Sequence, residues 1–174
     1  MGIFPIMLDS EGGLHKTFMA RLGVNLDPSV IYKAPVHTVD EVAKVISTIM
    51  KTYKADNAGA KREEMQKVLI VVDSLGFLST PSEQEQFNKG DMKGDLGRKA
   101  RQLKALVSQC VALFHGVEVG LVATNHTYKS QDQFNPDDVI SGGQGFIFAS
   151  DIAIALNKLK LKNENCLLYT SDAA

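Results

Sequence analysis

Residues 67–76 constrain the fold more than any other part of the sequence. They read KVLIVVDSLG, in which the apolar run 68–72 continues without alternation into Asp73 and Ser74. A continuous run rich in β-branched residues is typical of a strand that is buried on both faces of a parallel sheet. We therefore expect a central parallel strand that ends in an acid.

The position of Asp73 makes it a candidate functional residue. The carboxyl ends of parallel strands form the edge at which open α/β sheets bind their ligands. In proteins that hydrolyse nucleotides, a carboxylate at this edge holds Mg²⁺ beside the phosphates, usually through water. The alternative from this strand alone is that Asp73 only caps the turn that follows.

Composition narrows the classes of protein. The 174 residues suffice for one α/β domain with a real core, and the formal net charge of −1 leaves no global basic field, so a nucleic-acid surface must be local. The two cysteines, Cys110 and Cys166, cannot build a disulfide framework or a four-ligand zinc site, which favours a cytoplasmic location. Because no apolar run reaches the ~18 residues that span a bilayer, no membrane partner is expected.

Strand and helix patterns alternate along the chain. Strands are expected at residues 3–8, 30–34, 117–123 and 151–156 in addition to the central one, and helices at 14–22, 39–54 and about 95–114. Thr38 and Glu41 have the spacing of a capping box before the second helix. This alternation predicts an α/β fold with a mostly parallel central sheet flanked by helices.

The last residues do not continue the pattern. Residues 163–174 show neither turn chemistry nor a sheet period, and they resemble translated adapter or vector sequence. We expect residues 1–162 to hold the domain and the tail to be non-native. A native β-strand is the alternative.

Three of the expected strands end in polar groups, which are Glu11, Asp73 and the pair Asn125-His126. In a parallel sheet these ends fall on one edge. Glu11 can take a proton from a water that attacks a γ-phosphate, and Asn125 or His126 can hydrogen-bond the phosphate or the water. The pattern indicates phosphoryl transfer, in which positioning and charge do most of the work. Taken alone, His126 would be read as a surface-loop histidine.

A phosphate-cradling loop is missing from the printed sequence. The motif G-x-x-x-x-G-K-[ST] does not occur, and no glycine is followed directly by lysine. Lys16-Thr17 follows Gly12-Gly13, but His15 stands where the motif needs its second glycine. We therefore expect negligible ATPase activity from residues 1–162 alone, because the backbone amides that hold phosphates are absent.

A local basic segment could bind nucleic acid. Its basic side chains are Lys89, Lys93, Arg98, Lys99, Arg101 and Lys104. A basic, glycine-containing loop that runs into a helix suits a phosphate backbone. The alternative is a solvated helix face.

Several segments considered together are more specific than any single residue. They are LDSEGG at 8–13 with FMARLGVN at 18–25, IVVDSLGFL at 70–78, KGDMKGDLGRKARQLKAL at 89–106, ATNHTYKSQ at 123–131 and SGGQG at 141–145. In order and spacing, from Met1 to about Lys162, they resemble the RecA-type recombinases, most closely the UvsX-like recombinases of phages. The resemblance implies a RecA-like P-loop NTPase core that lacks its P-loop strand, as an internal fragment would.

The resemblance also implies roles at the nucleotide. Glu11 matches the catalytic glutamate, and Phe18 matches an aromatic residue that contacts adenine. Asp73, with Ser74 beside it, matches the acid that supports Mg²⁺. Asn125 and His126 match the polar pair that senses the γ-phosphate. The implied cofactors are ATP and Mg²⁺.

Two DNA-binding loops are implied in the same way. The first covers residues 89–101, with the candidate contacts Lys89, Lys93, Arg98, Lys99 and Arg101. The second covers residues 128–143, with the candidate contacts Tyr128, Lys129, Phe134, Gly142 and Gly143. The implied partners are single-stranded DNA, double-stranded DNA and further copies in a helical filament.

The expected function is that of a fragment of a DNA-dependent ATPase, which forms filaments on single-stranded DNA and catalyses homologous pairing and strand exchange. One alternative is a replicative helicase of the same fold, although it would not be expected to carry the DSEGG and NHTY segments together. The other is a non-enzymatic RecA-like regulator. Glu11 and Asp73 argue against the regulator, whereas the missing phosphate loop keeps it open.

Overall fold

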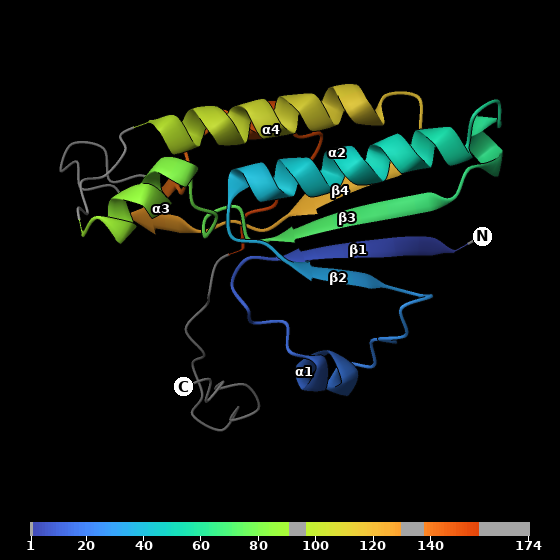
Figure 1. The fold of residues 1–174 in the computed structure, drawn as a ribbon, viewed down its shortest axis with the longest axis horizontal. Helices are drawn as coiled ribbons and strands as arrows, with labels where there is room; N and C mark the ends of the chain where they lie inside the picture. Colours follow the sequence, from blue (N-terminus) through green and yellow to red (C-terminus); the bar gives the residue numbers. More distant parts are fainter. Residues whose placement is uncertain (1, 91–96, 130–137, 157–174) are drawn as a thin grey trace.

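A computed structural model describes residues 2–90, 97–129 and 138–156. Its centre is a four-stranded sheet made of β1 (Ile3–Asp9), β2 (Tyr32–Pro35), β3 (Lys67–Asp73) and β4 (Val119–Ala123). The strands lie in the order β2-β1-β3-β4, and every neighbouring pair is parallel. All four arrowheads therefore point to the same side of the molecule (Figure 1). The α/β fold with a parallel central sheet is confirmed.

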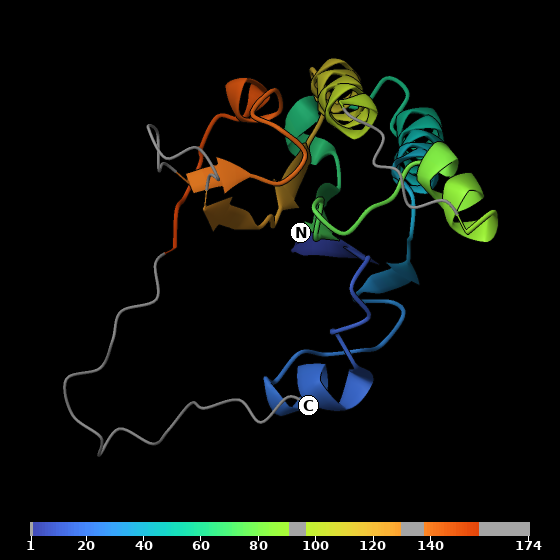
Figure 2. The ribbon, with the colours of Figure 1, turned by 90° about the vertical axis from the view of Figure 1, so that its left-hand side faces the viewer.

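The two long helices cover the same face of the sheet. These are α2 (Val39–Asp56) and α4 (Arg98–Phe114), whereas the short α1 (Lys16–Arg21) lies on the opposite side (Figures 1 and 2). The core forms between the sheet and the long helices, and its most deeply buried side chains include Leu8, Ile46, Met50, Ile70 and Leu103. Among the described residues, no helix has the length and apolar character that a membrane span requires.

This one-sided cover corrects the expectation for the central strand. Val68, Ile70 and Val72 are buried, but Leu69 and Val71 between them are partly exposed. Side chains alternate between the two faces of a strand, so Val68, Ile70 and Val72 lie on one face and Leu69 and Val71 lie on the other. Burial on both faces is therefore wrong for the face that looks away from α2 and α4, because, of the helices that the structure describes, only the short α1 lies on that side.

Helix α1 differs from its expected packing. The helical spacing of Leu14, Phe18 and Leu22 in the sequence predicts that they share one apolar face, but Phe18 and Leu22 are exposed and Met19 is buried instead. The helix has only six residues, so a single side chain is enough to anchor it. The sequence pattern, extended over nine residues, gave the wrong face.

Two connections contain structure that the sequence pattern missed. The polar stretch 79–94 holds α3 (Pro81–Asn88), which begins with a capping box between Thr80 and Glu83. The long loop 127–145 holds β5 (Thr127–Lys129) and β6 (Asp138–Ile140), which pair antiparallel. Two short 3₁₀ turns, η1 (Arg62–Glu64) and η2 (Ile147–Ala149), complete the described elements.

The strand expected at residues 151–156 does not form. Ile152, Ile154 and Leu156 are strongly exposed, and the backbone there forms no strand. Their apolar alternation gives strand character, but a strand also needs a neighbour to pair with. The expected non-native tail lies outside the described residues.

The capping box at the start of α2 gives a prediction about stability. Thr38 Oγ1 accepts from the Glu41 amide at 3.1 Å, and the Thr38 side chain is buried. Thr38→Ala should lower the free energy of unfolding by about 1 kcal/mol, because it leaves a helix-terminal amide without its partner. Urea unfolding measures this as a lower midpoint at constant slope.

Thr48→Ala is the matched control on the same helix. Thr48 is exposed, and its hydroxyl donates to the Lys44 carbonyl at 2.8 Å, a group already within the helix. Its removal should change stability by less than about 0.5 kcal/mol. Equal losses in the two variants would contradict the assignment of a cap.

Candidate functional site

The carboxyl edge of the sheet brings together Glu11, Ser74 and His126. Glu11 Oε1 accepts from Ser74 Oγ at 2.6 Å and from His126 Nε2 at 2.8 Å. The hydrogen bonds from Ser74 and then His126 hold the pKa of Glu11 below its ordinary value, so its carboxyl is ionised at neutral pH. The expectation that strand ends far apart in sequence meet at one edge is confirmed.

Ser10 locks the end of β1 to the end of β3. The Ser74 amide donates to Ser10 Oγ at 2.7 Å, and Ser10 Oγ in turn donates to the Ser74 carbonyl at 2.7 Å. The Ser10 amide also donates to the Asp73 carbonyl at 2.7 Å. The peptide bond between Asp73 and Ser74 is cis. Glu11 and Ser74 therefore project from two strand ends whose backbones are fixed to each other.

Asp73 ends β3 beside this cluster, as predicted. Its Oδ1 accepts from the Thr124 hydroxyl, which extends from the end of the neighbouring β4. Within the described ranges, no three or more His, Cys, Asp or Glu side chains gather into a metal site. A single carboxylate fits Mg²⁺, which is commonly held by one or two carboxylates together with phosphates and water.

Asn125 and His126 are tied to the segment that follows β6. Asn125 Nδ2 donates to the Ser141 carbonyl at 2.9 Å, and the Ser141 amide donates to the His126 carbonyl at 2.9 Å. The Phe77 ring packs edge-on against the His126 ring, with centroids 5.5 Å apart. A change in the position of His126 would therefore alter its contacts with both the segment after β6 and the loop that carries Phe77.

Gly76 allows this close packing. A Cβ on Gly76 would lie 2.8 Å from Asn125 Oδ1 and 3.3 Å from the His126 ring. The first distance is shorter than van der Waals contact allows, so the loop that carries Phe77 reaches the pair only because residue 76 has no side chain.

An ion pair that the sequence did not predict secures the Glu11 loop. Lys33 Nζ on β2 lies 2.9 Å from the buried Asp9 Oδ2 and also donates to the Leu14 carbonyl. The other Asp9 oxygen accepts from the Gly12 amide at 2.8 Å. Backbone groups on the carboxyl side of Glu11 are therefore anchored by Asp9 and Lys33. The sequence signal was a single lysine within the apolar stretch before Pro35.

Phe18 and the expected DNA contacts lie elsewhere. Phe18 is on α1, which lies beneath the sheet in Figure 1. Lys89, which directly follows α3, pairs with Glu85 at 2.5 Å, and Arg101 is exposed on α4. Arg98, at the first position of α4, is exposed as well. Lys93 and Phe134 fall outside the described residues.

The second expected DNA loop is described in part. Tyr128 is exposed on β5, where its neighbour Lys129 also lies. Gly142 and Gly143 have positive φ, and a Cβ on them would meet Leu103 and Ala100 of α4. These two glycines therefore let the chain after β6 pack closely on α4. The structure shows this packing role for them, and their contact with DNA stays a prediction.

The fold and the site define an α/β domain that gathers polar side chains at the carboxyl edge of a parallel sheet. No known family model matches the chain. Over 158 residues, 91% of the chain, it is 27% identical to a protein of Enterobacteria phage T4 described as a recombination and repair protein. The chain spans 37% of the length of that relative.

The Asp9 pair predicts a pH-dependent part of stability. Burial alone would raise the Asp9 pKa, but hydrogen bonds from Lys33 and Gly12 and the charge of Lys33 bring it below its ordinary value. The stability that the ionised Asp9 contributes is therefore full above the pKa of an unfolded aspartate and is lost as the pH falls through the lower folded-state pKa. Asp9→Asn should cost about 1.5–3 kcal/mol at pH 7, the range for hydrogen bonds to charged groups.

Denaturant unfolding at a series of pH values measures this difference between Asp9→Asn and the parent, which should shrink below pH ~4. Asp56→Asn, an exposed carboxylate at the end of α2, controls for the change in net charge. A pH-independent difference for Asp9→Asn would show that the ionised carboxylate is not the source.

Proposed function

We propose that the chain is the central part of a DNA-dependent ATPase that assembles on single-stranded DNA and pairs it with a homologous duplex. The observation that carries the proposal is the convergence of Glu11, Ser74 and His126 beside Asp73 at the carboxyl edge of the sheet. The similarity to a phage recombination and repair protein also supports this proposal. The RecA-like, UvsX-like family assignment is part of this proposal.

Each polar group has a place in ATP hydrolysis. Ionised Glu11 accepts a proton from the attacking water or orients that water. Asp73 would hold Mg²⁺, which neutralises charge on the phosphates when it is bound. Asn125 and His126 would hydrogen-bond the γ-phosphate, which requires His126 to exchange its bond with Glu11 for one with the phosphate.

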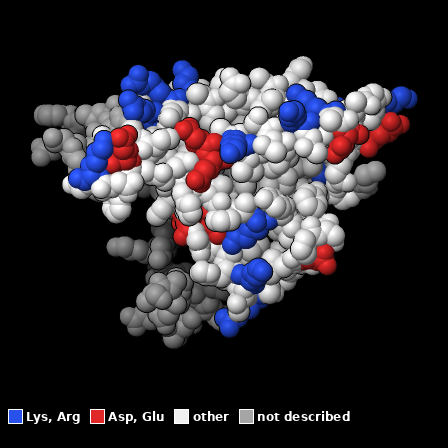
Figure 3. Space-filling model, in the orientation of Figure 1, with Lys and Arg blue, Asp and Glu red and all other residues white. Residues whose placement is uncertain are grey.

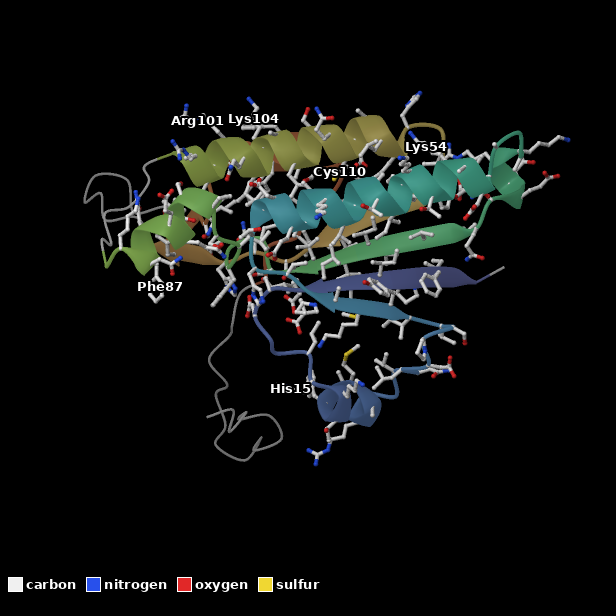
Figure 4. All side chains as sticks on the ribbon, in the orientation of Figure 1. His15, Lys54, Phe87, Arg101, Lys104 and Cys110 are labelled. Carbon is white, nitrogen blue, oxygen red and sulfur yellow. The ribbon has the colours of Figure 1, made fainter. Side chains whose placement is uncertain are left out.

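A basic surface lies near this edge and suits DNA. Lys and Arg side chains gather over the first part of α4 although the whole chain has a net charge of −1 (Figure 3). Arg101 and Lys104 point away from the sheet on this helix (Figure 4). Contacts between such cations and phosphates release counterions and read no base sequence. The exposed ring of Tyr128 offers a surface for base stacking.

The partners follow from this function. The protein would bind single-stranded and double-stranded DNA and associate with further copies in a helical filament, in the cytoplasm of a bacterium or a phage-infected cell. ATP and Mg²⁺ would be its cofactors. Filament formation and strand exchange belong to the whole protein, of which this chain would supply the strand-edge acids and the basic helix.

Glu11→Gln tests the proposed base. In a longer protein that joins this chain to a phosphate-binding loop, it should reduce the rate of ATP hydrolysis by on the order of 10²-fold or more, because glutamine cannot accept the proton. Binding of ATP and DNA should persist. Glu63→Gln, an exposed carboxylate at the opposite end of the sheet, is the control. Unchanged turnover in Glu11→Gln would place the base elsewhere.

The DNA surface is tested on the chain itself. Replacing Arg101 and Lys104 together by Gln should flatten the dependence of log affinity on log salt by roughly 1–2 units, since about 0.7 counterions are released per phosphate contact on a single strand. Fluorescence anisotropy with a labelled single-stranded oligonucleotide across a salt series gives the slope.

The matched control replaces Lys51 and Lys54 by Gln. Both are exposed on α2, and Lys54 lies toward the other end of the helical layer (Figure 4). This variant has the same change in net charge, so it should keep the parent slope. If both double variants flatten the slope equally, the effect is one of global charge and the first part of α4 is not the DNA surface.

A further inference from the structure

Lys99 is turned inward, unlike the neighbouring basic residues of α4. Its Nζ donates to the Gly76 carbonyl at 2.5 Å, and its side chain is partly buried. Burial lowers the Lys99 pKa, and the charge of the nearby Glu83 acts against this effect. Arg101 and Lys104 are exposed on the same helix. Lys99 therefore faces the loop after β3.

That loop is held from two sides. Lys99 contacts the carbonyl of Gly76, and the Cα of Gly76 packs so closely on Asn125 that no Cβ fits between them. The next residue, Phe77, places its ring on His126. A continuous set of contacts thus runs from the start of α4 through Gly76 and Phe77 to the residue that hydrogen-bonds Glu11.

We propose that Lys99 is a positioning residue, which fixes the Gly76–Phe77 loop against Asn125 and His126, and not a contact to DNA phosphates. The basic surface of α4 and the nucleotide site then share one loop, so a shift of the start of α4 changes the position of His126. The link itself is geometric, whereas its meaning for ATP and DNA rests on the proposed function.

The link is tested by NMR on this chain. Lys99→Met removes the ammonium and keeps the aliphatic stem, so the fold should persist, which circular dichroism checks. Because the ring current of Phe77 shifts the signals of nearby protons, release of the loop should move the His126 ring signals toward their positions in a Phe77→Leu reference variant. Lys99→Arg keeps a donor for the carbonyl and should restore the parent signals.

The control is Lys104→Met, which changes an exposed lysine five residues further along α4. It should leave the His126 ring signals at their parent positions. Parent-like His126 signals in Lys99→Met would overturn the proposal. So would equal displacements in Lys99→Met and Lys104→Met, because the effect would then belong to the helix charge and not to the contact with Gly76.

A DNA measurement separates this inference from the proposed function. Lys99→Met should keep the parent salt slope for a single-stranded oligonucleotide, and a loss of ~0.7 unit would place Lys99 on a phosphate and overturn the inference. If the parent itself binds no DNA, the proposed DNA surface fails. The NMR comparison then still decides whether Lys99 positions the loop.

Discussion

The parallel pairing of β1 with β3 is the constraint on which the site depends. The register of this pair places Asp9 opposite Asp73, so the two strands end at the same level of the sheet. Ser10 then bonds to the backbone of both Asp73 and Ser74. A shift of one residue would turn the side chains of one strand to the other face and separate Glu11 from Ser74. The hydrogen bonds at the edge are therefore consequences of strand register.

The sequence predicted correctly the features that follow from local rules or from strand direction alone. The capping box at Thr38 is local, and the meeting of Glu11 with His126 needs only that strand ends share an edge. The same capping signature begins α3 at Thr80, but that helix was missed because it buries no side chain and so has no apolar stripe. Apolar periodicity detects packing, and α3 is formed by its cap and its polar turns.

The rest depends on contacts between elements. The pairing of Lys33 with Asp9 requires that β2 lie next to β1, and the strand order is not written in the periodicity of either strand. Likewise, a count of basic residues gives Lys99 and Arg101 the same role. Lys99, however, is partly buried and donates to the Gly76 carbonyl in the loop after β3, whereas Arg101 is exposed on α4. The distribution of charge along a helix in the sequence does not predict which basic side chains will contact a neighbouring loop.

The hydrogen bonds on Glu11 also govern its strength as a base. Ser74 and His126 stabilise the carboxylate and hold its pKa down, and a carboxylate with a lower pKa accepts a proton less readily. Under the proposed function, transfer of His126 to a phosphate removes one of these bonds and leaves the other. The proton affinity of Glu11 then rises when a phosphate is in place. Without nucleotide, both hydrogen bonds remain and Glu11 is a weaker base toward water.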